Sequence, residues 1–173
     1  MIRLAEMADF PQILAVYQKA REFMKENGNP SQWGDTFPRE EVLRNDIEEK
    51  KHLYVITRGE KDAEIIAGVF ALIIGPDPTY AVIKPYGGDP PENTGFWLDE
   101  SLYGTIHRLA SGGRAHGIFA EAIAYSRRQI AHLRIDTHAD NLIMQSLIAR
   151  AGFSRRGIIY TDDGSPRIAY ELI

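Results

Sequence analysis

The segment of residues 106–131 constrains the fold more than any other part of the chain, because it joins a strand, a glycine turn and a helix. An apolar, β-branched run ends near Leu109, and residues 111–113 then supply turn chemistry. From Ile118 onward, apolar residues recur at helical spacing. At the start of such a helix the first N–H groups are unpaired and the macrodipole is positive, so the segment predicts a site for a phosphate group.

The glycines of this turn also have a purely structural explanation. Gly112, Gly113 and Gly117 suit a tight strand-to-helix connection that binds nothing. Arg114 favours an anion site, because it places a side chain that can contact phosphate directly beside the glycines. Neither GxxxxGK[ST] nor a GxGxxG after a strand occurs, so a P-loop or a dinucleotide-binding fold has little support.

The sequence of the turn and of a later helix resembles one known family. Residues 114–119, Arg-Ala-His-Gly-Ile-Phe, look like the (Gln/Arg)-x-x-Gly-x-(Gly/Ala) signature of the GNAT family, the Gcn5-related N-acetyltransferases. Residues 141–153 resemble the same family's Asn-x-x-(Ala)-x-x-Leu-Tyr-x-x-x-Gly-Phe segment, in the family's order and separation. Because residues 2–5 also look like the family's first strand, the resemblance covers nearly the whole chain.

The resemblance implies that acetyl-CoA is the acyl donor, with its pyrophosphate on the glycine turn. Its pantetheine arm would pair with the strand before the turn in the manner of an added strand. Two positions depart from the family pattern, since Phe119 replaces a small residue and Ile148 stands where many members have tyrosine. The residues that the resemblance assigns to cofactor binding are Leu109, Ala110, Arg114, Ala115, His116, Gly117, Ile118, Phe119 and Asn141.

Acyl transfer to an amine needs a base, because an aliphatic amine with a pKa of about 10 is mostly protonated at neutral pH. His107 is the first candidate, since it lies in the strand that would flank the thioester and imidazole titrates near neutral pH. His138, after the next strand, is the second candidate, and a structural role stays the alternative for both. Ile148 has no proton for the leaving thiolate, so either another acid acts or the thiolate leaves with help from a dipole or water. Tyr160 is the expected acid, with Tyr103 as the alternative.

The histidines also raise the question of a metal site. No pair of them has HxxxH spacing on one expected helix, and no acidic ligand set accompanies them. The chain has no cysteine, which excludes thiolate ligands and a cysteine nucleophile. No metal is therefore expected.

Two loops with large aromatic side chains are the expected walls of the acceptor pocket. Trp33 lies among the turn residues 27–38, and Trp97 lies in the long, glycine- and proline-rich segment 84–100. Loops of this kind are often functional. The alternatives are a hydrophobic lid over the chain's own core for Trp33 and surface decoration for Trp97.

Composition narrows the class of protein. A chain of 173 residues is most simply one domain, residues 1–173. The net charge of −4 argues against a nucleic-acid partner and mildly favours a cationic acceptor, such as the amine of a small molecule or peptide. Without an apolar run of membrane-span length or a signal-peptide pattern, a cytoplasmic protein with no membrane partner is expected. A homodimer stays open.

The expected elements follow the order β-α-α-β-β-β-α-β-α-β-β. This order predicts an α/β (α+β) fold with one mixed, mostly antiparallel sheet of about six to seven strands and helices on both faces, which is the GNAT-like architecture. Asp9 and Asp140 are the expected N-caps of two helices. Residues 58–64 are the expected turn of a hairpin, and residues 80–83 a short extended piece.

The first functional hypothesis is therefore an acetyl-CoA-dependent N-acetyltransferase. A second keeps the fold and changes the acyl group. A third, from another class, is a CoA-binding sensor or interaction domain without turnover, which the departures at Phe119 and Ile148 keep open.

Overall fold

Strands and helices alternate along the chain in the order that the sequence predicts. The computed structural model describes residues 1–59, 63–88, 90 and 93–173. The elements have the following bounds: β1 Ile2–Leu4, η1 Met7–Asp9, α1 Phe10–Glu26, α2 Glu40–Glu48, β2 Leu53–Arg58, β3 Ile65–Ile74, η3 Pro78–Tyr80, β4 Gly104–Ser111, α3 Ile118–Gln129, β5 Leu133–Thr137, α4 Leu142–Arg150, β6 Ser154–Tyr160 and β7 Pro166–Leu172.

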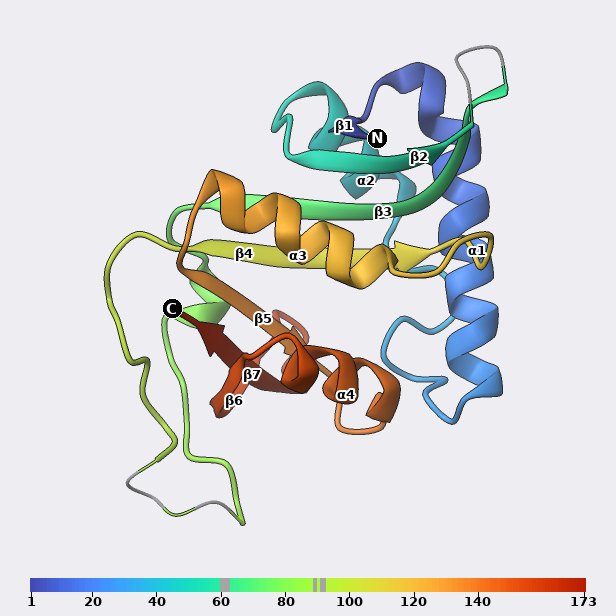
Figure 1. Cartoon of the computed structure of the whole chain (residues 1–173). Coiled ribbons are helices and arrows are strands. Elements are labelled where there is room, and N and C mark those ends of the chain that lie inside the picture. Colours follow the sequence, from blue (N-terminus) through green and yellow to red (C-terminus); the bar gives the residue numbers. More distant parts are fainter. Residues whose placement is uncertain (60–62, 89, 91–92) are drawn as a thin grey trace. The chain divides into compact units, whose positions relative to one another are not determined.

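The strands follow one another in a seven-stranded sheet with the order β1-β2-β3-β4-β5-β7-β6 (Figure 1). β4 pairs with β5 in parallel, whereas the pairs β1–β2, β2–β3, β5–β7 and β6–β7 are antiparallel. The prediction of a mixed, mostly antiparallel sheet with helices is confirmed.

The backbone divides into two compact units. The first unit comprises Met1–Leu72 and His107–Tyr125, and the second comprises Ile73–Ile106 and Ser126–Ile173. That residues 1–173 are one functional domain stays a prediction.

In the first unit, α1 and α2 cover one face of the sheet. Apolar residues at helical spacing bring Ile13 and Tyr17 of α1 and Leu43 of α2 to this face, where none of the three has exposed surface. They form one core with Val55 and Val69, which alternate with residues of the opposite face along β2 and β3. Burial of this apolar stripe, rather than helix propensity, holds both helices in place.

The opposite face of the first unit carries α3. Tyr54 and Phe70 stack with their ring centroids 5.4 Å apart, and the ring of Tyr125 from α3 lies 5.1 Å and 6.1 Å from them. A Cβ atom on Gly68 would lie 2.4 Å from the Ile118 side chain, so only glycine lets the first turn of α3 pack this closely on β3. The start of α3 is therefore fixed against the sheet.

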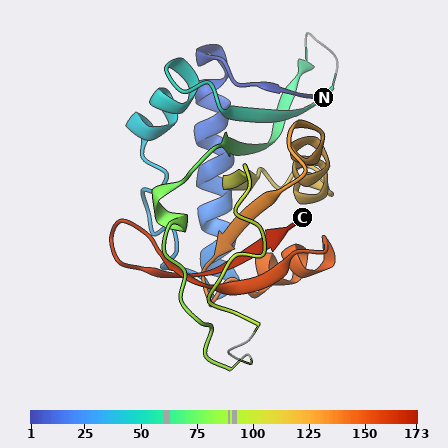
Figure 2. The ribbon, with the colours of Figure 1, turned by 90° about the vertical axis from the view of Figure 1, so that its left-hand side faces the viewer.

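In the second unit, one face of the sheet carries the segment before β4. Tyr80 and Trp97 stack at 5.6 Å and pack with Ile159 and Ala169 of the sheet. Helix α4 is visible beside β5 and β7 in both ribbon views (Figures 1 and 2), and its Ile148 is fully buried. The expected extended piece at residues 80–83 is wrong, because Tyr80 ends a 3-10 turn and its ring is in the core.

Of the two expected aspartate caps, Asp9 occupies the N-cap position of α1, but its side chain makes no capping hydrogen bond, and the cap at Asp140 is wrong. The carboxylate of Asp9 accepts from the Glu6 N–H and pairs with Arg3 at 2.7 Å instead of capping α1. The hydrogen bonds from Arg3 lower the pKa of this carboxyl. At α4 the cap is Asn141, whose side-chain oxygen accepts from the Met144 N–H at 3.1 Å.

Parts of two predicted loops lie outside the described residues. These parts are residues 60–62 of the hairpin turn and residues 89, 91 and 92 of the segment 84–100. Across the rest of the chain, the structure has no helix that is both long enough and apolar enough to cross a bilayer.

Candidate cofactor site

The turn between β4 and α3 has the tight, glycine-dependent backbone that the sequence predicts. The Gly112 N–H donates to the Ala67 carbonyl at 2.9 Å, and a Cβ atom on Gly112 would lie 3.3 Å from Val16 of α1. Gly113 and Gly117 have φ angles of 72° and 78°, which side-chain-bearing residues rarely adopt. The turn therefore needs glycine for its shape and leaves its backbone accessible.

The start of α3 supplies unpaired N–H groups at this turn. The first helical bond runs from the Glu121 N–H to the Gly117 carbonyl at 3.0 Å. The N–H groups of residues 118–120 therefore have no acceptor within the helix, and the helix dipole makes this end positive. Phe119, the departure from the family pattern, points its ring into the core, so it does not fill the exposed side of the turn.

Two positively charged side chains lie at the turn. Arg114 is exposed on it, and a Cβ atom on Gly113 would lie 4.0 Å from the Lys19 side chain of α1. The imidazole of His116 is exposed as well. Glu121 is the acidic residue of the first turn, and Arg58 of β2 pairs with its carboxylate. Lys19 and Arg58 were missed from the sequence, because each lies far along the chain from the turn.

Strand β4 leads into the turn and contains an unusual residue. His107 and Leu109 are half-buried, and Ala110 belongs to the core under α1 and α2. Between them, Arg108 has a φ of 53°, a conformation that costs an ordinary residue roughly 1–2 kcal/mol. The Tyr17 hydroxyl donates to the Arg108 carbonyl at 2.8 Å, and burial raises the pKa of Tyr17, which keeps this hydroxyl a neutral donor.

The other two catalytic candidates lie in the second unit. The Nδ1 atom of His138 accepts from the Asp140 N–H at 3.2 Å, which places the proton of a neutral ring on Nε2. Tyr160, the last residue of β6, is exposed, and the Lys84 ammonium lies 5.2 Å from its ring centroid. Ile148 has no exposed surface, so its position on α4 contributes only packing. The catalytic roles of His107, His138 and Tyr160 stay predictions.

The two tryptophans differ in their surroundings. Trp33 is half-buried in the first unit, edge-on to Tyr17 at 5.8 Å and 6.2 Å from Phe37. Trp97 in the second unit is only 8% exposed, and its indole N–H donates to the Tyr80 carbonyl at 3.0 Å. Little of the Trp97 ring is available to a ligand, whereas the half-buried Trp33 keeps part of its surface exposed. Their acceptor-binding role stays a prediction.

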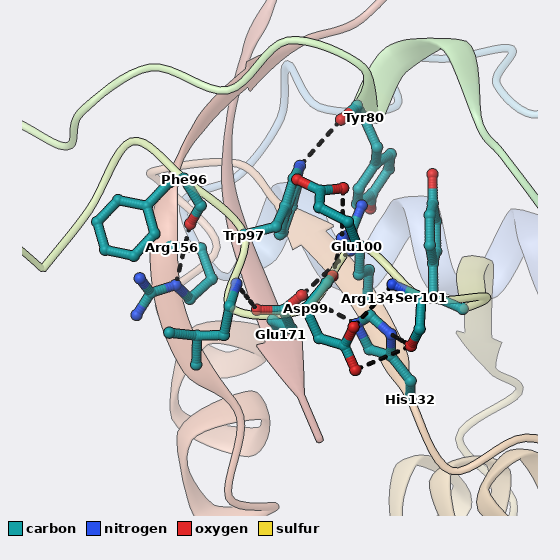
Figure 3. Close-up of polar contacts among 12 residues, drawn as sticks. Tyr80, Phe96, Trp97, Asp99, Glu100, Ser101, His132, Arg134, Arg156 and Glu171 are labelled. Atoms are coloured by element: carbon teal, nitrogen blue, oxygen red, sulfur yellow. Dashed lines mark hydrogen bonds and ion pairs between the residues drawn. The ribbon is translucent and has the colours of Figure 1, made fainter.

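A buried charge cluster, formed by Arg134, Glu171 and His132, holds Trp97 in place (Figure 3). The Arg134 guanidinium lies 4.0 Å from the Trp97 ring centroid and 3.9 Å from that of Tyr103. Glu171 Oε1 lies 3.3 Å from Arg134 Nε and 2.9 Å from His132 Nε2. This cluster was missed from the sequence, although Arg134 stands as a charged residue between the apolar Leu133 and Ile135 of β5.

Among the residues that the structure describes, no group of three or more histidine, aspartate or glutamate side chains could hold a metal ion. The predicted site residues divide between the two units. His107, Leu109, Ala110, residues 114–119 and Trp33 lie in the first unit, and Trp97, His138, Asn141 and Tyr160 lie in the second.

The fold is that of GNAT acetyltransferases, as comparison with solved structures shows. A GNAT-family acetyltransferase from Streptococcus agalactiae is 28% identical, with a TM-score of 0.77 over 100% of this chain and 94% of that one. A protein from Staphylococcus aureus assigned as an acetyltransferase is 25% identical, with a TM-score of 0.66 over 99% and 97% of the two chains. The NatC complex bound to Gag peptide and CoA is 16% identical, with a TM-score of 0.56 over 99% and 96% of the two chains, and at this identity it shows the fold alone.

The chain has the GNAT fold and is similar over nearly its whole length to acetyltransferases of the GNAT family. Its structural neighbours support acetyl transfer as the general activity. A scan of the sequence against protein-family models gives no match, and a search of curated protein sequences gives none either.

Proposed function

We propose that the protein is an acetyl-CoA-dependent N-acetyltransferase that modifies a primary amine of a small molecule or peptide by direct attack on the thioester. The observation that carries this proposal is the strand, glycine turn and helix start at residues 107–120. Unpaired N–H groups, a positive helix end and exposed Arg114 converge there on a place that glycine leaves open. The CoA bound to the structurally similar NatC complex supports the choice of ligand.

The residues of the turn fit a pyrophosphate. The N–H groups of residues 118–120 would bind phosphate oxygens, and Arg114 would add a charge-assisted hydrogen bond. Leu109 and Ala110 would pair with the amides of the pantetheine arm through their backbone. Residues 115–117 would form the wall of the turn, and Asn141 would contribute from the start of α4.

The proposed chemistry needs no covalent enzyme intermediate. The bound thioester supplies the activated acetyl group. His107, or His138 in its place, takes one proton from the ammonium, directly or through water, and so frees the lone pair of the amine. The amine nitrogen bonds to the acetyl carbon, the carbon–sulfur bond breaks, and the thiolate takes a proton from Tyr160 or from water. The nitrogen then loses its second proton, which restores the proton of that donor. Backbone N–H groups of β4 stabilise the oxyanion of the tetrahedral intermediate.

The acceptor is proposed to be cationic before it reacts, since the chain carries a net charge of −4. Trp33 offers an aromatic surface beside Tyr17 and Phe37 for its carbon skeleton. The proposed setting is the cytoplasm, where acetyl-CoA and amines are both present.

The test is thiol release from acetyl-CoA across a panel of small-molecule and peptide amines. The wild type is expected to release thiol with at least one amine and to give one acetylated amine per thiol. His107→Gln is expected to lower kcat by about 10² to 10⁴, because a general base is worth this much, while acetyl-CoA affinity stays unchanged. An unchanged kcat in His107→Gln would remove His107 from the mechanism.

The same assay separates the enzyme from a CoA-binding sensor, which the buried Ile148 at the family's tyrosine position keeps as the second candidate. Binding of acetyl-CoA without turnover on any amine would favour the sensor. Turnover with any acceptor would exclude it.

A further inference from the structure

Arg108 has a left-handed backbone conformation, which arginine rarely adopts. Within the described parts of the chain, Lys51 and Arg108 are the only non-glycine residues with a positive φ, at 50° and 53°, and only Arg108 lies in a strand. Conformations of this kind persist where the surroundings hold them, and they are common at functional sites. The contacts of Arg108 therefore indicate what holds it in this conformation.

Two side chains from elsewhere in the chain contact Arg108, and a third contacts one of these two. Asp46 of α2 lies 2.7 Å from the Arg108 guanidinium, and His52 lies 2.8 Å from the other oxygen of the same carboxylate. The Tyr17 hydroxyl of α1 donates to the Arg108 carbonyl. Backbone and side chain of Arg108 are thus held separately.

The ion pair between Asp46 and Arg108 is largely shielded from water. The Asp46 side chain is 5% exposed and that of Arg108 is 14% exposed. An interaction this buried is weakly screened, so the guanidinium stays in place. Because the ion pair is buried, a variant without the Asp46 carboxylate leaves the Arg108 charge buried and unpaired.

The torsion angles of Arg108 set the directions of the peptide groups on both sides of it. His107, the proposed base, precedes Arg108. Leu109 and Ala110, which are proposed to pair with the pantetheine arm, follow it. Holding Arg108 therefore fixes how the N–H and C=O groups after it point.

We propose that Asp46 is a positioning residue, which through Arg108 fixes the backbone direction at Leu109 for the acyl donor. This inference rests on the proposed function. Helix α2 thereby contributes to the cofactor strand without supplying a residue to the reaction, and His52 holds the Asp46 carboxylate in the orientation that Arg108 needs.

The test compares Arg108→Gly with Arg108→Ala. Both variants remove the guanidinium, but only glycine adopts a positive φ without strain. We expect kcat of Arg108→Ala to be about a hundredfold below that of Arg108→Gly, since a small misplacement of a bound substrate has an effect of this size. KM for acetyl-CoA should rise by a smaller factor than kcat falls, because the turn at residues 112–117, which is proposed to hold the pyrophosphate, is intact.

Asp46→Asn is expected to lower kcat in the same way. The double variant Asp46→Asn with Arg108→Gly is expected to restore kcat, because glycine adopts the positive φ without an ion pair and leaves no unpaired cation. Lys51→Gly and Lys51→Ala are the matched controls outside β4, and their kcat values should be equal. Equal kcat values for Arg108→Gly and Arg108→Ala, or a double variant as slow as Asp46→Asn, would overturn the inference.

A second readout does not depend on turnover. The amide resonance of Leu109 in the ligand-free full chain should shift in Arg108→Ala and Asp46→Asn and stay near its wild-type position in the double variant. A wild type without turnover on any amine counts against the proposed function alone. A Leu109 amide that is unmoved in Arg108→Ala and Asp46→Asn overturns the positioning role whatever the turnover result.

Discussion

Gly117→Glu is expected to abolish acetyl-CoA binding. The wild type should gain thermal stability from acetyl-CoA by mass action, about 2.7 kcal/mol at a hundredfold excess over Kd. For a chain of this size this corresponds to a rise in Tm of roughly 5–11 °C. Glutamate at position 117 places a carboxylate against the pyrophosphate at the positive end of α3, so the ligand-induced rise should disappear.

The control for Gly117→Glu must separate charge from backbone strain. Gly164, in the turn between β6 and β7, has the same φ of 78°, and a Cβ atom there would meet nothing within 4 Å. Gly164→Glu therefore introduces the same strain and the same charge in the turn between β6 and β7. It should lower the Tm of the free protein but keep the full rise with acetyl-CoA. Loss of the rise in both variants would contradict a site at Gly117.

Glu171→Gln is expected to have the largest effect on stability. Glu171 Oε1 accepts from both Arg134 and His132, and its Oε2 accepts from the Leu98 N–H at 2.6 Å. Glutamine keeps the shape but leaves the buried Arg134 guanidinium without its buried counter-charge, which costs about 3–5 kcal/mol. Thermal unfolding followed by circular dichroism should show a Tm lower by roughly 6–20 °C.

Glu100→Gln is the matched control, because Glu100 pairs with the same guanidinium. Its carboxylate lies 3.6 Å from Arg134 Nη2 but is 79% exposed, whereas the Glu171 side chain has no exposed surface. Exposed ion pairs contribute about 0–1 kcal/mol, so this variant should unfold close to the wild-type Tm. Equal Tm values for both variants would show that burial of Glu171 is not what makes the cluster stabilising.

The features that could be predicted from the sequence are those with a local pattern. Helix α3 has the expected start at Ile118, where the glycine turn ends and apolar spacing becomes helical, and β5 follows it in the expected order. The last two strands of that order, β6 and β7, pair as a hairpin, because turn residues separate two β-branched runs. The tight glycine turn of the cofactor site was predicted for the same reason.

The features that could not be predicted depend on residues far apart in the chain. Asp46 reads as part of a charged helix face, and only the fold brings it to Arg108. Glu171 and Arg134 meet because β5 and β7 are neighbours in the sheet. The choice between Asp140 and Asn141 as a helix cap was open locally, since both residue types cap equally well. Trp97 was expected in a loop, but its indole is buried against Tyr80.

Calorimetric titration of the wild type tests the central claim most directly, that the glycine turn and the start of α3 bind the pyrophosphate of acetyl-CoA. Acetyl-CoA and CoA should both bind at one site per chain. Pantetheine, which lacks the pyrophosphate, should bind much more weakly, because the N–H groups of residues 118–120 and Arg114 then have no partner. No heat of binding with acetyl-CoA or CoA at millimolar ligand, or equal affinity for pantetheine and CoA, would contradict this claim.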